Sequence, residues 1–478
     1  MLYQELIGKH KSSDCIILSD GKQKLTYSEL DELVQKQAEQ MKGLGVKAGM
    51  RVLIRNENTI QTAAEILACI YLHVCFLPLP EEITEEQLAY IVADSQAVLL
   101  IDHAGKGSQL LSQNRIDNFS TKEKELIYIL YTSGSTGKPK GVMASYKQVI
   151  FCINAINQCL GNGPEDCILC ALPLSFDYGL YQLFLALHCE AKLILYRCRL
   201  IQQIPAILKK ERITAFPSMP AMIKMMLKAG LLQRVDLPDL RYISSTGENF
   251  EVELICRIRK LFPHIFIFPM YGLTECKRVS IMLQNRWDKV LEGSCGIPLP
   301  GTKVYLENVR EDGVGELIVS GPNVMEGYWN DNSSQDSFFE DDKGKKCLRT
   351  GDYFYIDKEG FLYFRGRKKR ILKTNGHRIS CLELEIYLKS YLKDDVEEIR
   401  IIGVPSEIEG ERIIACLQSQ QDICYLKEQL QKIVLRLPQY QRPHSFFCTK
   451  TAFALNINGK IDENRLRECV KNNELYKL

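Results

Sequence analysis

The sequence predicts an α/β protein: a large region of layered helices and largely parallel strands, then a β-rich subregion and a small C-terminal α/β domain. Strand-like apolar runs alternate with helix-period segments along most of its 478 residues, as in parallel sheets covered by helices. Beyond about residue 290, short apolar runs between Gly, Asn and Asp turns indicate the β-rich subregion. The length exceeds that of one domain, at roughly 100–200 residues each.

The individual elements follow from local patterns. Helical periodicity covers Tyr27–Met41 and Ile204–Lys210. Apolar runs bounded by turn residues predict the strands of the α/β region: Val52–Ile54, Ala97–Ile101, Ile127–Tyr131, Cys167–Leu172, Leu193–Tyr196, Ala215–Pro217, Arg241–Ser245 and Ile265–Phe268. The same signals predict the strands of the β-rich subregion: Lys303–Leu306, Gly315–Val319 and Phe361–Phe364.

The basic segment Arg365–Arg370 separates the β-rich subregion from the C-terminal tail. It fits either a solvated charged turn or a hinge between two domains. With a hinge at Lys369, the chain divides into domains at residues 1–368 and 369–478.

Composition and charge exclude several classes of protein. Lys and Arg number 61 against 59 Asp and Glu, so the net charge of +2 gives no sign of a nucleic-acid-binding surface. The apolar stretch Ile66–Leu77 falls short of the ~20 residues that cross a bilayer, and the N-terminus lacks a signal-peptide core. We therefore expect a soluble cytoplasmic protein that binds neither membrane nor nucleic acid. Cys167 and Cys170 form a CxxC pair, but their apolar surroundings favour a buried strand over a metal site.

One stretch, Tyr131–Gly141, carries a clear chemical signal. Three glycines allow a sharp turn that brings backbone N–H groups close to a ligand. The hydroxyls and lysines add hydrogen-bond donors and positive charge that suit phosphate oxygens. It is not a Walker A loop, because Pro139 follows Lys138 where that loop has Ser or Thr. The stretch predicts a nucleotide-phosphate site.

With this stretch and the further motifs given below, the chain resembles the adenylate-forming enzymes, which comprise acyl-CoA synthetases, luciferases and the adenylation domains of peptide synthetases. The resemblance covers essentially the whole chain and keeps the family's motif order. Its matching segments are Leu25–Leu30, Tyr131–Gly141, Tyr271–Glu275, Leu348–Asp352, Gly366–Arg367, Gly376–Arg378, Leu437–Pro438 and Asn458–Asp462. The resemblance implies a large N-terminal domain and a small mobile C-terminal domain hinged at Lys369.

The resemblance also implies ATP and Mg²⁺ as cofactors and a set of site residues. Glu275 matches the magnesium ligand, and a hard oxygen ligand suits that ion. Asp352 and Arg367 match the ribose contacts, and Lys460 matches the lysine that bridges the carboxylate and ATP. Thr132 and Lys140 complete the catalytic set. The expected nucleotide-binding residues are Thr132, Ser133, Gly134, Ser135, Thr136, Gly137, Lys140, Gly247, Glu248, Tyr271, Gly272, Thr274, Asp352 and Arg367.

The segment around Phe176–Asp177 bears on the substrate. Adenylation domains for α-amino acids carry Phe-Asp here, with the aspartate paired to the substrate ammonium; the other interpretation of Asp177 is a helix N-cap. Arg278 fits either a contact with a polar substrate group or a structural ion pair. The same resemblance implies that the acid pocket is lined by Phe176, Asp177, Tyr178, Tyr181, Ile243, Ser245, Met270, Arg278, Val279 and Lys460.

These observations predict an AMP-forming ligase that stands alone. It would activate a small amino acid and load it on the phosphopantetheine thiol of a separate carrier protein. The alternative is an acyl-CoA or acyl-carrier ligase for an acid without an amino group. A third hypothesis, a non-catalytic nucleotide-binding protein, is disfavoured because Lys140, Glu275, Asp352 and Lys460 are all present.

Overall fold

The computed structural model describes residues 2–10, 13–55, 57–102, 107–111, 125–132, 139–248, 250–330, 337–374, 377–406, 410–455 and 461–478. They form two compact units, one of Met1–Tyr305, Ile318–Arg349 and Asp357–Tyr363, the other of Leu306–Leu317, Thr350–Ile356 and Phe364–Leu478. Within the described ranges, no helix is long and apolar enough to cross a bilayer. Lys369 lies in the short 3-10 helix Lys368–Arg370 of the second unit, and its hinge role stays a prediction.

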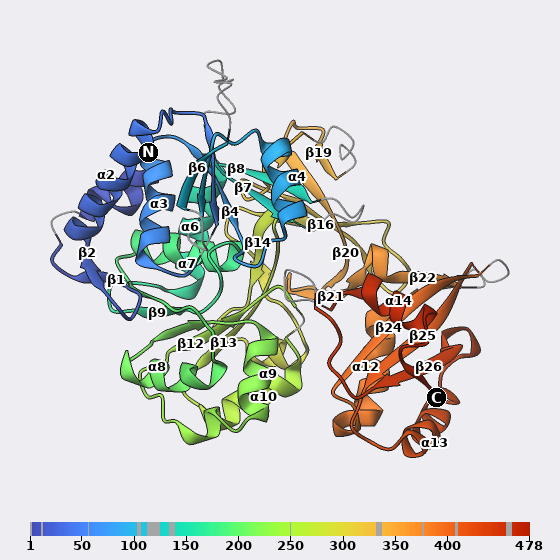
Figure 1. The fold of residues 1–478 in the computed structure, drawn as a ribbon. Coiled ribbons are helices and arrows are strands. Elements are labelled where there is room, and N and C mark those ends of the chain that lie inside the picture. Colours follow the sequence, from blue (N-terminus) through green and yellow to red (C-terminus); the bar gives the residue numbers. More distant parts are fainter. Residues whose placement is uncertain are drawn as a thin grey trace. The chain divides into compact units, whose positions relative to one another are not determined.

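The first unit contains a nine-stranded sheet whose centre is parallel, as the alternating pattern predicts (Figure 1). Its order is β15-β14-β13-β12-β11-β9-β10-β1-β2, and β2, β14 and β15 pair antiparallel at the two edges. The strands are β1 Ile16–Ser19, β2 Lys24–Thr26, β9 Cys167–Cys170, β10 Lys192–Leu195, β11 Ala215–Pro217, β12 Tyr242–Ser245, β13 Phe266–Leu273, β14 Cys276–Ile281 and β15 Ile297–Pro298.

A seven-stranded sheet of order β18-β8-β7-β4-β3-β5-β6 completes the α/β layers of this unit. Its strands are β3 Arg51–Arg55, β4 Cys75–Leu79, β5 Leu99–Asp102, β6 Gly107–Leu110, β7 Leu126–Thr132, β8 Lys140–Ser145 and β18 Gly327–Tyr328. The helices of the unit are α1 Leu2–Leu6, α2 Tyr27–Gly43, α3 Ile60–Tyr71, α4 Glu85–Ser95, α6 Tyr146–Leu160, α7 Asp177–His188, α8 Ile204–Lys210, α9 Pro220–Lys228, α10 Val252–Leu261 and α11 Trp287–Leu291. Every expected strand of the α/β region overlaps an observed one, so the predicted fold class is confirmed. Cys167 and Cys170 are buried in β9, as predicted.

Two helices, α6 and α7, lie between these sheets (Figure 1). Helix α6 contacts β7 and β8 of the smaller sheet and β14 of the larger one, whereas α7 contacts β9 and β10. Ten of the twelve residues of α7 are buried, as expected of a helix that is apolar on all sides. The first turn of α7 is therefore fixed by packing, which positions Asp177.

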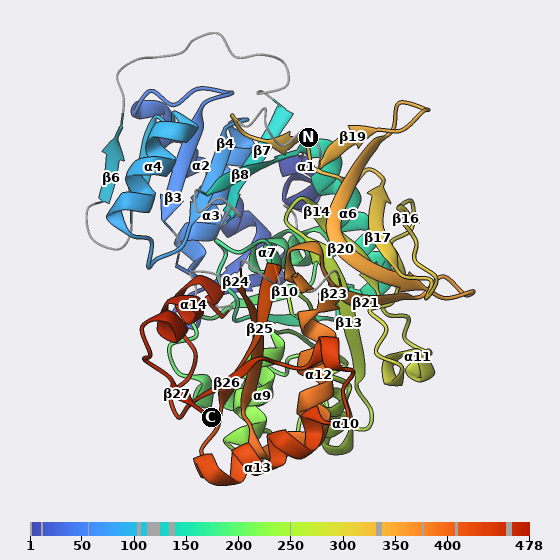
Figure 2. The same cartoon turned by 90° about the vertical axis from the view of Figure 1, so that its right-hand side faces the viewer.

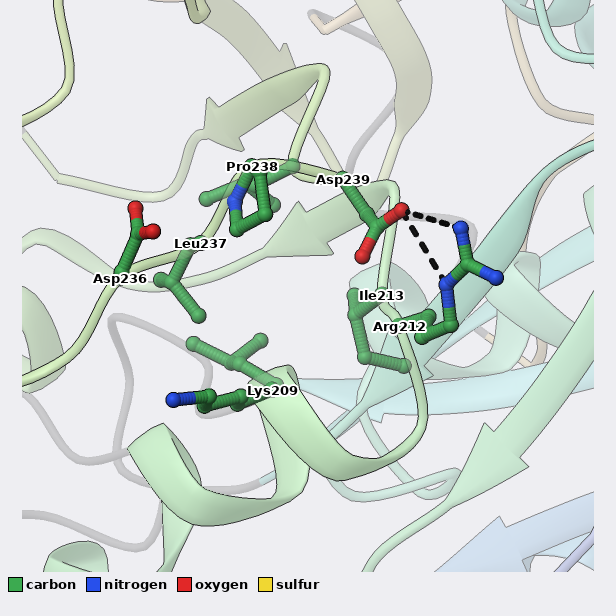
Figure 3. A pocket seen from close by; sticks show the side chains of 9 residues that line it. Lys209, Arg212, Ile213, Asp236, Leu237, Pro238 and Asp239 are labelled. Carbon is green, nitrogen blue, oxygen red and sulfur yellow. Dashed lines mark hydrogen bonds and ion pairs between the residues drawn. The ribbon is translucent and has the colours of Figure 1, made fainter.

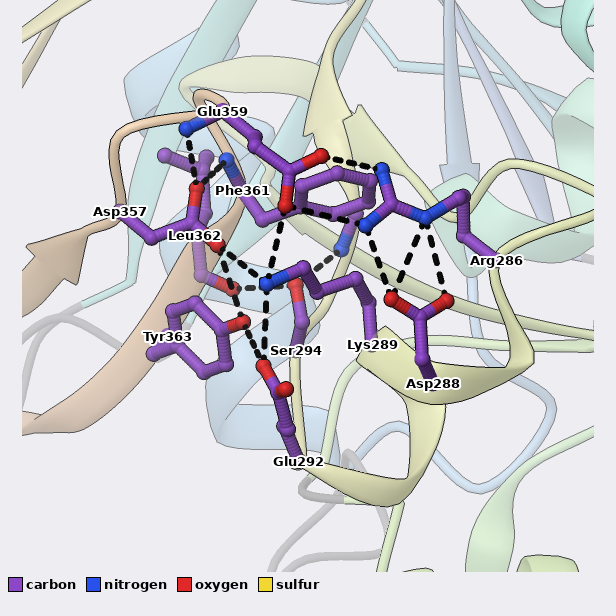
Figure 4. Close-up of polar contacts among 11 residues, drawn as sticks. Arg286, Asp288, Lys289, Glu292, Ser294, Asp357, Glu359, Phe361, Leu362 and Tyr363 are labelled. Atoms are coloured by element: carbon purple, nitrogen blue, oxygen red, sulfur yellow. Dashed lines mark hydrogen bonds and ion pairs between the residues drawn. The ribbon is translucent and has the colours of Figure 1, made fainter.

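A cluster of charged residues ties α11 to the turn before β21 within the same unit (Figure 4). Lys289 Nζ lies 2.9 Å from Asp357 Oδ2, and Arg286 Nη1 lies 2.7 Å from Glu359 Oε2. The Tyr363 hydroxyl donates to Glu292 Oε2 at 2.6 Å. Several charges share partners here, and such a network holds its geometry better than an isolated surface ion pair.

A five-stranded sheet carries residues of both units. Its order is β16-β17-β20-β19, with β21 beside β20. The strands are β16 Lys303–Glu307, β17 Gly315–Ser320, β19 Phe338–Glu340, β20 Lys346–Ile356 and β21 Leu362–Arg367. These strands match the predicted β-rich subregion.

The second unit contains a six-stranded sheet of order β23-β22-β25-β26-β27, with β24 beside β25 (Figure 2). Neighbouring residues of β24 enter different apolar clusters: Ile401 packs with Leu388 of α12 and Leu430 of α13, whereas Ile402 packs with Leu466 of α14. Because side chains alternate along a strand, α14 covers the face opposite to α12 and α13. The elements are β22 Ile371–Thr374, β23 His377–Ser380, β24 Glu398–Ser406, β25 Gly410–Gln418, β26 Ser445–Thr449, β27 Tyr476–Lys477, α12 Cys381–Leu392, α13 Ile423–Val434 and α14 Glu463–Lys471.

The first turn of α7 yields a stability prediction. A Cβ on Gly179 would stand 2.7 Å from the Leu172 carbonyl oxygen and closer still to that of Pro173, which are backbone atoms that cannot rotate away. We expect Gly179→Ala to destabilise the protein by about 1–3 kcal/mol, in the range of overpacked cores, and to lower the melting temperature. Gly43→Ala is the matched control, because Gly43 ends α2 and a Cβ there meets nothing within 4 Å. Equal melting temperatures for the two variants would contradict the close packing of Gly179 against these backbone carbonyl groups.

Candidate active site

The β13–β14 hairpin presents much of the predicted site. Tyr271 and Gly272 lie in β13, Thr274 and Glu275 form the tip, and Arg278 lies in β14. A Cβ on Gly272 would stand 2.9 Å from the backbone nitrogen of Arg278, so this close approach requires glycine. Arg278 itself has a φ of 51°, an uncommon conformation for a non-glycine residue, at an irregular point of the ladder.

One tyrosine brings a predicted phosphate-binding lysine and the predicted metal ligand together. The Tyr328 hydroxyl donates to Glu275 Oε1 at 2.7 Å, and Lys140 Nζ lies 5.2 Å from the centre of the Tyr328 ring. Thr132 ends the strand paired with Lys140 and donates its hydroxyl to the Lys140 carbonyl at 3.5 Å. A cation suited to phosphate oxygens and a carboxylate therefore flank the same ring.

The donors at the hairpin tip fit a magnesium ion bound together with a nucleotide. Mg²⁺ prefers oxygen ligands and is commonly held by one or two carboxylates plus substrate phosphates. Glu275 offers a carboxylate oriented by Tyr328, with the Thr274 hydroxyl next to it in sequence. Among the described residues no group of three or more His, Cys, Asp or Glu is arranged to hold a metal alone. Phosphate oxygens of the nucleotide and water would complete the coordination.

Asp177 lies at the first position of α7 and has a charged partner that the sequence did not predict. Lys277 Nζ of β14 lies 3.2 Å from Asp177 Oδ2, and the two side chains are only 2% and 15% exposed. The N-cap of α7 is Phe176, so the interpretation of Asp177 as an N-cap is wrong. In this structure the Asp177 carboxylate is paired with the Lys277 ammonium. A role for Asp177 as the ligand of a substrate ammonium stays a prediction.

Lys277 is buried among aromatic rings. Its Nζ lies 4.4 Å from the centre of the Tyr181 ring and 5.8 Å from that of Tyr178. Burial lowers the pKa of the Lys277 ammonium to about 8, although the Asp177 carboxylate opposes that shift. At neutral pH the ammonium is therefore protonated and paired.

Arg278 is buried beside this pair and stacks on Tyr178, with its guanidinium carbon 5.0 Å from the ring centre. Arg278 forms no ion pair with any described residue, so the described part of the chain does not show the structural ion pair that was one of its two interpretations. Its Nε is a buried atom without a hydrogen-bond partner. Tyr178 is held in turn by a 2.8 Å hydrogen bond between its hydroxyl and Ser244 Oγ.

The end of β12 holds further predicted residues. Ser245 and Thr246 are buried, and their hydroxyl oxygens have no hydrogen-bond partner among the described residues. Gly247 follows with a φ of +90°, and a Cβ there would stand 3.1 Å from the Met219 methyl carbon and 3.9 Å from the Phe176 ring. Buried polar atoms left without partners are uncommon, and a bound ligand or an ordered water would satisfy them. The other residues of this unit that were predicted to line the acid pocket, Ile243, Met270 and Val279, are buried in β12, β13 and β14, and Glu248 follows Gly247.

The second unit holds the two predicted ribose contacts next to each other. Arg367 Nε lies 3.0 Å from Asp352 Oδ1, and the Asp352 side chain is 2% exposed. The Thr350 hydroxyl accepts a hydrogen bond from the Asp352 backbone N–H at 3.1 Å. The carboxylate is thus fixed in position beside the guanidinium.

Several predicted residues lie outside the described part of the chain. These are Ser133, Gly134, Ser135, Thr136 and Gly137 of the glycine-rich stretch, and Lys460. Their assigned roles stay predictions.

A pocket of about 200 Å³ lies elsewhere in the first unit, next to α8 and the segment before β12 (Figure 3). Arg212 and Asp239 form an ion pair of 2.8 Å at its edge. None of the predicted site residues lines it, and Arg212 is largely exposed. Its chemistry is that of a surface hollow rather than of a catalytic site.

Sequence reasoning missed Lys277 and Tyr328. A signal for Lys277 exists, because two adjacent cations stand inside the otherwise strand-like run from Cys276 to Ile281. A fully buried lysine is uncommon without a partner or a function. Tyr328 gave no comparable signal, since a tyrosine after glycine in a turn-rich region is ordinary.

Comparison with protein families gives a match over most of the first unit. A family model described as AMP-binding enzyme matches residues 7–329. Bacitracin synthase 1 of Bacillus licheniformis is 28% identical over 480 residues. That match covers 96% of this chain but 9% of the relative, so the chain spans a small part of the curated relatives that it resembles.

Two solved structures resemble the fold. O-succinylbenzoate coenzyme A synthetase (MenE) from Bacillus subtilis, in complex with ATP and magnesium ion, has a TM-score of 0.82 and is 24% identical. The match covers 97% of this chain and 99% of MenE. VinN in complex with L-aspartate has a TM-score of 0.66 and is 28% identical over 77% of this chain and 98% of VinN.

The lowered pKa of Lys277 predicts how stability depends on pH. Between pH 8 and about 10.5 the folded protein has released this proton while the unfolded chain keeps it, so stability rises with pH in that window. We expect wild type to gain on the order of 1–3 kcal/mol relative to Lys277→Met between pH 7.5 and 10, measured by urea unfolding. Lys260→Met, which alters an exposed lysine of α10, is the control and should show no such change. A pH-independent difference between wild type and Lys277→Met would contradict the buried, titrating ammonium.

Proposed function

The chain belongs to the AMP-binding enzyme family, and on that premise we propose that it is an AMP-forming ligase that activates a small amino acid and transfers it to a thiol. The observation that carries the proposal is the placement of Lys140 and Glu275 against the same tyrosine. Adenylation brings a carboxylate and a polyphosphate together, so a cation and a metal-binding carboxylate are needed at one place. The reaction would take place in the cytoplasm, where ATP is available.

The proposed reaction has two steps. A carboxylate oxygen of the substrate attacks the α-phosphorus of ATP, an acyl–AMP bond forms, and the bond to pyrophosphate breaks. A thiolate then attacks the acyl carbon, a thioester forms, and AMP leaves. The thiol would belong to the phosphopantetheine of a carrier protein, with coenzyme A as the alternative acceptor.

Each residue has a distinct task in this proposal. Lys140 offsets phosphate charge, and Glu275, oriented by Tyr328, would hold Mg²⁺. The magnesium ion, when bound, neutralises charge on the phosphates. Asp352 would accept the ribose hydroxyls with Arg367 beside it, and Lys460 would align the substrate carboxylate with the α-phosphate. The ATP and magnesium complex of MenE supports this choice of cofactors.

The choice of an amino acid rests on Phe176–Asp177 and is supported by the relatives. Bacitracin synthase 1 is by its name a synthase of bacitracin, and VinN was solved in complex with L-aspartate. The Asp177–Lys277 pair favours a second candidate, a ligase for a carboxylic acid without an amino group, because Asp177 already has a cationic partner.

We also propose that residues 369–478 change orientation about Lys369 between the two steps. Lys460 must be near the substrate carboxylate in the first step, whereas a bulky thiol must reach the same carbon in the second. A hinge in which a few residues change φ and ψ is the usual way to exchange such groups.

Lys460 gives the test of adenylation itself. We expect Lys460→Ala to lower ATP–pyrophosphate exchange by about a hundred-fold or more, because the charge that aligns the two anions is lost. Transfer of the acyl group from supplied acyl-adenylate to a thiol should stay within a few-fold of wild type. Lys450→Ala, at an exposed lysine just after β26, is the matched control. Equal loss of both half-reactions would assign Lys460 a structural role, and absence of exchange in wild type with any acid would refute the proposed function.

Asp177 decides between the two candidate functions. If it binds a substrate ammonium, its loss leaves that charge without a partner, and amino-acid activation should fall by about a hundred- to a thousand-fold. The measurement is pyrophosphate exchange with an amino acid and its des-amino analogue, for wild type and Asp177→Ala.

Because Asp177→Ala also leaves Lys277 unpaired, the double variant Asp177→Ala/Lys277→Met is the control. It removes both buried charges, so it should retain pyrophosphate exchange with the des-amino acid and still lose exchange with the amino acid. If wild type prefers the des-amino acid, the amino-acid proposal is wrong and the acyl ligase takes its place.

A further inference from the structure

The buried end of β14 carries more positive charge than its surroundings balance. Asp177 compensates Lys277 at 3.2 Å, but Arg278 is 3% exposed and forms no ion pair with a described residue. Asp177, Lys277 and Arg278 together therefore carry a net charge of +1. A buried charge without a counter-charge is costly, and proteins pair such groups or use them to bind a ligand.

The arginine is held in place although its charge is not satisfied. Its backbone carbonyl accepts a 2.9 Å hydrogen bond from Asn323 Nδ2, and the close approach of Gly272 fixes the chain opposite. Its guanidinium stacks on Tyr178, while its Nε has no hydrogen-bond partner. A donor that is rigid, buried and unsatisfied is suited to bind an acceptor without a cost in conformational freedom.

We propose that Arg278 and Lys277 form an anion subsite that selects substrates with a second carboxylate besides the one that is adenylated. This inference rests on the proposed adenylation activity and holds for either candidate substrate class. A guanidinium offers parallel N–H donors that match the two oxygens of a carboxylate. For a substrate without an ammonium, the net charge of +1 is balanced by one carboxylate, whereas a phosphate would bring more negative charge than the group can neutralise.

Arg278 belongs to the acid pocket rather than to the nucleotide site. It stacks on Tyr178 of α7, the residue next to Asp177, and Lys277 lies against Tyr181 one turn further along the same helix. The phosphate-binding candidates Lys140 and Glu275 are instead linked through Tyr328. The two rings of α7 also limit the room beside the cations, which favours a short-chain diacid.

The test compares acids that differ only in the second group. Pyrophosphate exchange would be measured with L-aspartate against L-asparagine, and with succinate against succinamate. Wild type should prefer the charged member of the preferred pair by about a hundred-fold or more. Arg278→Met should reverse or abolish that preference while keeping the amide substrate within about ten-fold, and Arg278→Lys should restore part of it. Arg257→Met, at an exposed arginine of α10, should behave as wild type.

A binding measurement makes the result independent of turnover. Succinate and L-aspartate should raise the melting temperature of wild type and not that of Arg278→Met, with Lys277→Met intermediate. Exchange with monocarboxylic acids alone would overturn this inference and leave the proposed function intact. No exchange with any acid would refute both. A raised KM for ATP in Arg278→Met, with the carboxylate preference unchanged, would reassign the arginine to the nucleotide site and overturn the inference.

Discussion

The contact between Asp177 and Lys277 is the interaction on which the geometry of the candidate acid pocket depends. It connects the first turn of α7, a helix buried between two sheets, to β14 at the edge of the nine-stranded sheet. Because both side chains are nearly inaccessible, the loss of either would leave a charge buried without its partner, which is among the most destabilising of single changes. Gly179 in the first turn of α7 and Gly272 in β13 both lie against backbone atoms that leave no room for a Cβ, so the helix and the hairpin are closely packed on either side of this contact.

The β13–β14 hairpin carries two different groups of candidate site residues within a few positions of each other. Its tip carries Thr274 and Glu275, whose carboxylate is linked to Tyr328 and thereby to Lys140. Three residues beyond Glu275, the strand enters the protein interior with Arg278 against α7. In the proposed function, one hairpin would thus contact the phosphates at its half-buried tip and the organic acid at its buried strand. Such an arrangement keeps the two reacting groups in a fixed relation, which is the main contribution that positioning makes to catalysis.

Sequence reasoning predicted the layers of the fold, and it named the polar residues of the candidate site without predicting how they pair. Strand and helix signals are local, so Cys167–Cys170 and Tyr27–Gly43 were within reach of pattern analysis. The partner of Asp177 was not, because Lys277 lies 100 positions away and the contact exists only once α7 is buried against β14. Arg278 was left between an ion pair and a substrate contact for the same reason, since only the folded chain reveals that Lys277, and not Arg278, forms the ion pair with Asp177. The roles assigned to Lys460 and to the stretch from Ser133 to Gly137 rest on family resemblance, with no described geometry to weigh them against.

The proposed anion subsite also reconciles the two interpretations of Asp177. If a second carboxylate binds at Arg278, the neighbouring Lys277 ammonium gains a second anion within its reach, and its hold on Asp177 weakens. A substrate with both an ammonium and a side-chain carboxylate could then exchange partners: its ammonium pairs with Asp177, and its carboxylate pairs with Lys277 and Arg278. Before binding, the pocket has one ion pair and one cation without a counter-charge, whereas afterwards the ammonium is paired with Asp177 and the two cations of β14 share one carboxylate. A monocarboxylic amino acid lacks the group that draws Lys277 away, so it must compete with an intact buried pair for Asp177. Recognition of the ammonium and of the second carboxylate are on this argument one coupled event, and a double-mutant cycle between Asp177 and Arg278 is the quantity that expresses the coupling.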